Sequence, residues 1–193
     1  MFRIYYWPVF MAVTVLWVLA RVGISFRQGR ISWRREFQML LVYICIVVVA
    51  RFTFFPFFKV KGKIQPLLFD AAKMFPPRIN LIPVVYLFDY PVFREALINF
   101  LGNSFMFLPL GIVWPVAFRK LDSHWKVIAA GAGTSLLIEI LQLPFFDRVS
   151  DVDDLILNTT GYLAGYGIYL LVRGISRFCK RRRGKKIKIR GGR

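Results

Sequence analysis

The sequence predicts an all-α integral membrane protein, a bundle of about five transmembrane helices. Hydrophobic residues make up 57% of its 193 residues and the mean hydropathy is +0.53, whereas a soluble domain is usually about 45–50% apolar. Lys and Arg outnumber Asp and Glu by 28 to 10, which gives a net charge of +18. A chain both apolar and strongly basic is typical of a polytopic membrane protein with positive charges in its cytoplasmic loops. It is unlike a disordered chain or a soluble enzyme.

Five apolar stretches provide the spans, since a helix needs roughly 17–25 mostly apolar residues to cross a bilayer. They are residues 4–20, 37–50 (extendable to 58), 96–118, 127–143 and 155–172. The chain then divides into an N-terminal transmembrane helix with a basic loop (1–39), a central transmembrane domain (40–172) and a basic cytoplasmic tail (173–193).

The basic residues predict the orientation. Of the 28, 19 lie in the 21–36 loop, the 119–126 loop and the tail from Arg173 onward. Because short cytoplasmic loops collect Lys and Arg, the N-terminus and the long 59–95 loop are expected outside and the C-terminus in the cytoplasm. Anionic lipid of the inner leaflet is the expected partner of the tail. No nucleic-acid partner is predicted, because no base-reading motif accompanies the charge.

An alternative makes residues 1–20 a cleaved signal peptide. Its first segment would carry only Arg3, and five arginines would follow the cleavage site. That charge order is the reverse of a signal peptide's, so residues 4–20 are expected to remain as a span.

No cofactor and no metal is predicted. Cys45 and Cys179 have no metal-ligand spacing, and the single histidine argues against a His-based site. The aspartates at 151, 153 and 154 could hold Mg²⁺ or Ca²⁺ through oxygen atoms, but their spacing fits no calcium-loop pattern.

Polar side chains concentrate at the outer ends of the predicted spans. Such groups are costly in a bilayer, so each needs a partner or a purpose. They are Arg51, Asn99, Asn103, Glu139, Gln142, Asp151, Asp153, Asp154 and Asn158. No comparable cluster lies at the inner ends, and this convergence predicts a functional site near the outer face.

Helical spacing places some of these polar residues on a common face of their span. Positions 131, 135, 139 and 142 form one stripe on the fourth span, and positions 151, 154, 158, 161 and 165 form one on the fifth. Gly161 and Gly165 suit close helix packing. The two spans are therefore expected to pack through their small residues and to open into a polar pocket above.

Structural roles offer another interpretation of the same residues. Ser150 and Asp153 have the spacing of a capping box, and aspartates suit the start of a helix. The two asparagines of the third span could be interhelical hydrogen-bond partners. Glu139 in a bilayer needs a partner such as Arg51 or Arg148, or a proton.

Five motifs together resemble the VanZ-like family. They are RFTFFP at 51–56, NLIP at 80–83, NFLGNSFMFLPLG at 99–111, SLLIEILQ at 135–142 and RxxDxDDLILNTxG at 148–161. Their order and spacing fit the family over about residues 40–172. The matching polar positions are Asn80, Asn103, Glu139, Gln142, Arg148, Asp151, Asp153, Asp154 and Asn158.

The resemblance implies a small multi-span protein of a bacterial cytoplasmic membrane, from a family whose namesake is associated with resistance to the glycopeptide antibiotic teicoplanin. One hypothesis is a pocket that recognises or shields against such an amphiphile, or binds a lipid-linked wall precursor. The other is an intramembrane enzyme acting on lipid headgroups, because a carboxyl group shielded from water can act as general acid or base. Glu139 would take that role, Asp151 or Asp154 would hold a metal or a hydroxyl, and Arg148 would hold a phosphate. A transporter is less favoured, because the sequence shows no inverted repeat.

Overall fold

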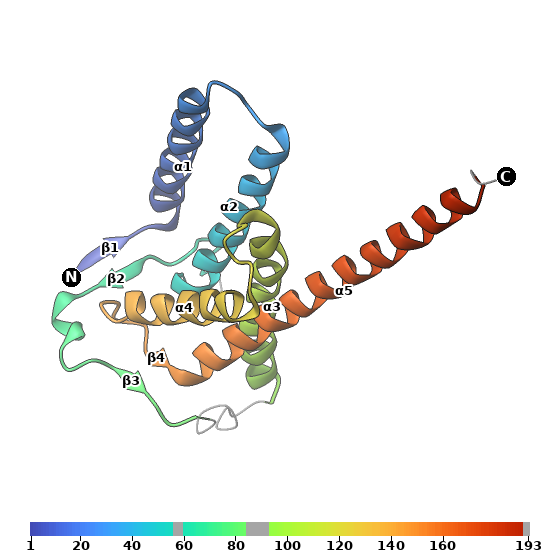
Figure 1. Ribbon diagram of the computed structural model, residues 1–193. Coiled ribbons are helices and arrows are strands. Elements are labelled where there is room, and N and C mark those ends of the chain that lie inside the picture. Colours follow the sequence, from blue (N-terminus) through green and yellow to red (C-terminus); the bar gives the residue numbers. More distant parts are fainter. Residues whose placement is uncertain (56–59, 84–92, 191–193) are drawn as a thin grey trace.

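The computed structural model confirms an all-α architecture. It describes residues 1–55, 60–83 and 93–190, and for 73–74, 93–96, 98–99 and 183–190 it describes the backbone only. The helices are α1 (Tyr6–Gln28), α2 (Trp33–Phe54), α3 (Phe93–Ala117), α4 (His124–Gln142) and α5 (Val152–Arg190). Figure 1 shows α3, α4 and the first half of α5 packed together, with α2 beside α3 and α1 at the edge.

Short strands attach the segment between α2 and α3 to the rest of the chain. β1 (Phe2–Ile4) pairs antiparallel with β2 (Leu67–Phe69), and a 3-10 turn follows at Ala71–Met74. β3 (Ile79–Asn80) pairs in parallel with β4 (Ser150–Asp151), the two residues that precede α5. This second pairing places the 79–80 segment directly over the start of α5.

The helices make the chain a multi-pass membrane protein. Within the described residues, four helical segments are long and apolar enough to cross a bilayer: α1, α2, residues 100–117 of α3 and residues 152–182 of α5. α4, where the sequence predicts the fourth span at 127–143, has 19 residues and is not in this group. Its buried face carries small and polar residues. These are Gly131, Ser135, Glu139 and Gln142, alongside Val127 and Ile138.

The core is formed where α2, α3, α4 and α5 meet. Its buried apolar members are Cys45, Val49, Phe107, Leu110, Val127, Ile138 and Tyr162. By contrast, α1 has no buried residue and is apolar on all sides. An all-apolar helix at the periphery faces lipid. It is tied to α2 by Arg21, whose Nε donates to Glu36 Oε2 at 2.9 Å.

The glycines of α5 pack against α3 and not, as the sequence predicts, against α4. A Cβ atom at Gly161 would lie 1.9 Å from the carbonyl oxygen of Ser104, and one at Gly165 would lie 2.0 Å from that of Leu108. Gly111 of α3 makes the reciprocal approach, because its Cβ would lie 1.9 Å from the carbonyl oxygen of Tyr162. The two backbones are therefore in direct contact.

The expected packing against α4 is wrong because positions 151, 154, 158, 161 and 165 do not all lie on one face of α5. Asn158 and Tyr162 face α4, where Tyr162 covers Gly131 and Asn158 bonds Ser135. Gly161 and Gly165 are rotated from that row by about 60°, because each residue advances the helix by about 100°. Two adjacent faces of α5 thus contact two different helices.

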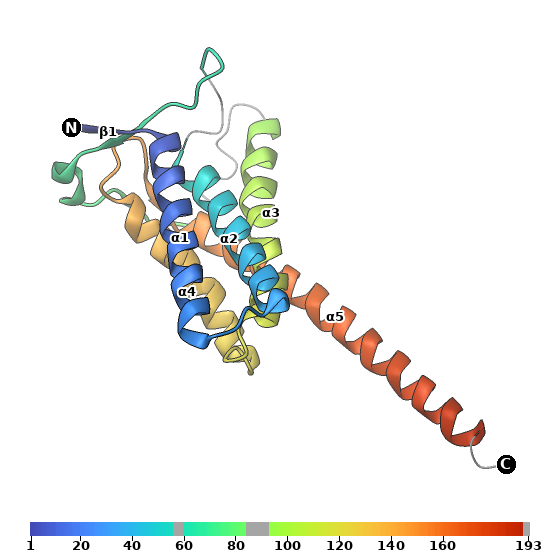
Figure 2. The ribbon, with the colours of Figure 1, turned by 90° about the horizontal axis from the view of Figure 1, so that it is seen from above.

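The predicted basic tail continues α5 as helix as far as Arg190, and Figure 1 shows this half of α5 extending away from the bundle. Figure 2 shows that α1 to α4 alternate in direction, so that the 29–32 and 118–123 connections lie at the same end of the bundle. The basic residues of both connections therefore gather there.

We predict that Gly165→Ala destabilises the protein by about 1–3 kcal/mol, the usual cost of overpacking, because the added methyl group meets the Leu108 backbone. The change is measured as a fall in the thermal unfolding midpoint of detergent-solubilised protein. Gly167→Ala is the matched control on the same helix, since a Cβ there meets nothing within 4 Å. It should be neutral or stabilise slightly through helix propensity. Equal effects of the two variants would contradict the close contact of α3 and α5.

The orientation predicted from charge is tested by cysteine labelling in a Cys45→Ser, Cys179→Ser background. An impermeant maleimide added to intact cells should label Lys61→Cys and leave Lys186→Cys unlabelled until the cells are permeabilised. The physical reason is the excess of Lys and Arg on the tail side. The reverse pattern would show that the assignment is inverted.

Candidate functional site

The end of α4 is bonded to the residues that open α5. The Oε2 atom of Glu139 accepts the backbone N–H of Asp151 at 3.0 Å. The Oγ atom of Ser150 donates to the backbone carbonyl of Glu139 at 2.6 Å. Glu139 is only 6% exposed, so its carboxylate is a buried acceptor that orients the 150–151 turn.

Asp151 caps α5 and is itself held from β3. Its Oδ1 atom accepts the backbone N–H of Asp153 at 2.9 Å, which satisfies one of the free amides at the start of the helix. Its two carboxylate oxygens accept from Asn80 Nδ2, each at 3.2 Å. The alternative capping box of Ser150 and Asp153 is not formed, because α5 begins at Val152 and the backbone N–H of Asp153 donates to Asp151.

Two further bonds join α5 to its neighbours one turn deeper. Asn103 of α3 donates through Nδ2 to Asp154 Oδ1. Asn158, which is 1% exposed, donates through Nδ2 to Ser135 Oγ of α4 at 3.1 Å. The Asn158 Oδ1 atom is buried with no hydrogen-bond partner in the described residues. These bonds join three helices around one polar centre.

Gln142 and Arg148 bind the free carbonyls at the end of α2. Gln142 Nε2 donates to the Thr53 carbonyl at 2.6 Å, and Arg148 donates from Nε and Nη2 to the Phe54 carbonyl at 3.3 and 3.0 Å. The last carbonyls of a helix have no partner within the helix, so the two side chains fix the end of α2 beside the start of α5.

The charges of this centre are unequal. Glu139 lies within electrostatic range of Asp151, Asp154 and Arg148. Burial lowers the pKa of the Arg148 guanidinium, and the carboxylate of Asp154 opposes that shift. Within the described residues, Glu139 forms no ion pair with an arginine. Glu139, Asp151, Asp153 and Asp154 are thus four acids close to the Arg148 guanidinium, which is itself bonded to a carbonyl.

Most of the site residues predicted from sequence come together here, and we call the group the polar cluster. It comprises Asn80, Asn103, Glu139, Gln142, Arg148, Asp151, Asp153, Asp154 and Asn158.

Arg51 lies at the edge of this group. It donates to the Phe55 carbonyl and lies over the rings of Tyr6 and Phe52. Asn99 belongs to α3, but its side chain is outside the described residues. The sequence did not indicate the carbonyls of Thr53 and Phe54 as partners, although both residues lie within the RFTFFP motif at 51–56. The described residues contain no group of three or more His, Cys, Asp or Glu side chains arranged to hold a metal.

A family model described as VanZ/LLP1 matches residues 40–173, about two thirds of the chain. The chain belongs to the VanZ/LLP1 family. The match confirms the resemblance read from the five motifs, and it covers every residue of the polar cluster. No curated protein and no solved structure matches the chain.

We predict that Asn103→Asp destabilises the protein, because it places a second carboxylate against Asp154 in a partly buried site. The variant also removes the donor to Asp154, and a buried acceptor left without a partner costs on the order of 1–3 kcal/mol. The thermal midpoint of solubilised protein measures the loss. The double variant Asn103→Asp, Asp154→Asn restores an amide–carboxylate bond with the partners exchanged, so it should recover much of the midpoint. Absence of any recovery would contradict a direct bond between the two positions.

Proposed function

We propose that this VanZ/LLP1 protein uses the polar cluster, at the outer face of a bacterial cytoplasmic membrane, to recognise or shield against an amphiphilic ligand of the cell envelope. The ligand is a lipoglycopeptide antibiotic such as teicoplanin or a lipid-linked wall precursor. The observation that carries the proposal is the convergence of Glu139, Asp151 and Asp154 at one end of the bundle, where their charge exceeds that of the nearby Arg148.

The chemistry of the cluster supports a polar, hydrogen-bonding headgroup. Carboxylate and amide oxygens accept hydrogen bonds from hydroxyl and amide groups, and teicoplanin presents a peptide core of that kind. Its acyl chain needs an apolar surface beside the polar one. The exposed apolar faces of α1, α2 and α3 supply such surface within the bilayer.

An intramembrane enzyme acting on lipid headgroups is the second candidate. The buried carboxylate of Glu139, bonded to the backbone of Asp151, favours it, because a carboxyl group shielded from water is suited to general acid or base chemistry. In that case Asp151 or Asp154 positions a hydroxyl or a metal, and Arg148 binds a phosphate.

The proposal is tested by binding and by resistance together. Purified protein in nanodiscs is titrated with fluorescent teicoplanin and with a lipid-linked wall precursor, and teicoplanin susceptibility is measured in a sensitive host expressing each variant. Asp154→Asn should weaken binding of one ligand by roughly tenfold, the value of one charge-assisted hydrogen bond. Asp122→Asn is the control, because Asp122 is an exposed carboxylate paired with Lys126 far from the cluster.

The same variants separate the two candidates. A recognition protein should tolerate Glu139→Gln better than Glu139→Ala, because the amide retains the shape and an acceptor oxygen. An enzyme should lose turnover with Glu139→Gln while still binding its lipid. If neither ligand binds and susceptibility is the same with Asp154→Asn as with the unaltered protein, the recognition hypothesis fails.

A further inference from the structure

A second polar region lies at the opposite end of the bundle from the polar cluster. A cavity of about 810 Å³ is lined by the start of α2, the end of α3, the connection to α4 and the middle of α5. α2 separates the two regions and is about 33 Å long for its 22 residues at about 1.5 Å per residue. That length matches the hydrocarbon core of a bilayer, about 30 Å, so the cavity lies at the other membrane surface.

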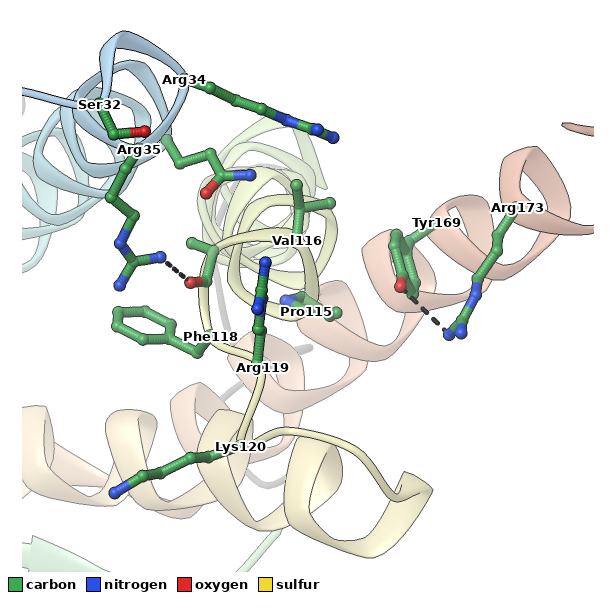
Figure 3. A pocket seen from close by; sticks show the side chains of 12 residues that line it. Ser32, Arg34, Arg35, Pro115, Val116, Phe118, Arg119, Lys120, Tyr169 and Arg173 are labelled. Atoms are coloured by element: carbon green, nitrogen blue, oxygen red, sulfur yellow. Dashed lines mark hydrogen bonds between the residues drawn. The ribbon is translucent and has the colours of Figure 1, made fainter.

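The lining of this cavity is strongly cationic. It contains five basic residues and no acidic one, and the basic residues are Arg34, Arg35, Arg119, Lys120 and Arg173. They come from three separate parts of the chain. Figure 3 shows Arg34, Arg119 and Arg173 around the space between α2, the end of α3 and α5, with Lys120 at its edge and its side chain extending away. Because like charges repel, an arrangement of this kind is stabilised by an anion.

Two of these side chains are held in place by the protein itself. Arg35 donates from Nη1 to the carbonyl of Ala117, at the end of α3. Arg173 donates from Nη1 to the hydroxyl of Tyr169, one turn earlier on α5, at 3.3 Å. Arg34, Arg119 and Lys120 are exposed. Guanidinium groups bind phosphate through paired N–H donors, so the fixed and the exposed cations together suit a phosphate.

The start of α2 adds uncharged donors to the same space. Its N-cap residue, Ser32, lines the cavity, and the serine side chain makes no capping hydrogen bond. The backbone N–H groups of Arg35 and Glu36 donate to the Ser32 carbonyl. The N–H groups of Trp33 and Arg34 and the positive end of the helix dipole therefore remain beside the cations. A helix N-terminus and arginines at one place reinforce each other in binding an anion.

The surroundings of the cavity identify a lipid as the source of that anion. Pro115, Val116 and Phe118 give the lining an apolar side. Trp33 and Trp125, 80% and 79% exposed, begin α2 and α4 at this end of the bundle. Exposed tryptophans mark the level of the lipid headgroups. A ligand here would reach the cations at headgroup depth with an apolar surface beside it.

We propose that this cavity binds the phosphate of an anionic phospholipid headgroup, on the membrane surface opposite to the polar cluster. The site is distinct from general attraction between the tail and the membrane, because four of its five cations precede α5. It is also independent of the function proposed for the polar cluster. Bound lipid would bridge α2, the α3–α4 connection and α5 through the cations that each of them contributes.

The test counts lipids retained by the full-length protein. Protein exchanged into neutral detergent is incubated with equal amounts of phosphatidylglycerol and phosphatidylcholine, and bound lipids are resolved by native mass spectrometry. We expect selective retention of phosphatidylglycerol. The triple variant Arg34→Gln, Arg119→Gln, Arg173→Gln should reduce that retention by roughly tenfold or more, since each basic residue near a membrane surface contributes about 1 kcal/mol.

A matched triple variant removes the same charge elsewhere. Arg27, Arg177 and Arg181 are exposed and do not line the cavity. Changing all three to Gln should leave retention within about twofold, and equal losses from the two triple variants would overturn the proposal in favour of diffuse attraction. Replacement of Arg34, Arg119 and Arg173 by Lys keeps the charge and is expected to preserve most binding. This variant changes the same three side chains as the Gln variant, so it controls for a failure of the Gln variant to fold.

A soluble anion is distinguished in the same experiment. Inorganic phosphate and pyrophosphate are added at millimolar concentration in place of lipid. Displacement of phosphatidylglycerol only at high concentration fits a lipid site. Tight binding of pyrophosphate without lipid, lost in the pocket triple variant, would assign the cavity to a soluble phosphate compound and overturn the lipid proposal. Equal retention of phosphatidylcholine and phosphatidylglycerol would also overturn it.

Discussion

The contact between the backbones of α3 and α5 is the constraint on which the rest of the bundle depends. Gly111, Gly161 and Gly165 allow this approach, because a Cβ atom at any of them would overlap a backbone atom of the facing helix. In a bilayer, lipid tails are as apolar as the side chains, so close van der Waals packing replaces the hydrophobic effect as the main attraction between helices. The same approach brings Asn103 of α3 within reach of Asp154 on α5.

The polar cluster and the fold stabilise each other. Glu139, Asp151 and Asn158 each hold two elements together, and Gln142 and Arg148 satisfy the last carbonyls of α2. A polar group in an apolar bundle is costly unless it is hydrogen-bonded. The residues that determine the connections at this end are thus the same residues that the proposed function assigns to a ligand.

The two ends of the protein have opposite electrostatic character. Acidic and amide groups gather where α4 leads into α5, and arginines gather where α1 leads into α2 and α3 leads into α4. The separation follows the length of a membrane helix, so each end meets a different leaflet. The protein therefore has a surface rich in acceptor groups at one end and a cationic surface at the other.

The sequence by itself determined the class of protein, the helices and the composition of the site. Apolar runs of sufficient length and an excess of Lys and Arg are local properties, and they hold wherever the helices lie in space. The sequence also predicts that Glu139, Asp151, Asp154 and Asn158 lie at the same end of the bundle, because position along a helix follows from residue number alone. The family motifs named the same residues.

Only the tertiary structure decided which helix each face meets. Gly161 and Asn158 are three residues apart, and helical spacing alone assigns them to the same stripe. In the structure Gly161 contacts α3 and Asn158 contacts α4, because these two helices pack on different sides of α5. The partners of Ser150, Gln142 and Arg148 are backbone carbonyls, which every sequence contains and no motif distinguishes. The cationic cavity likewise joins three segments whose proximity depends on how the helices pack, and nothing in the sequence distinguishes its four arginines and one lysine from the other basic residues.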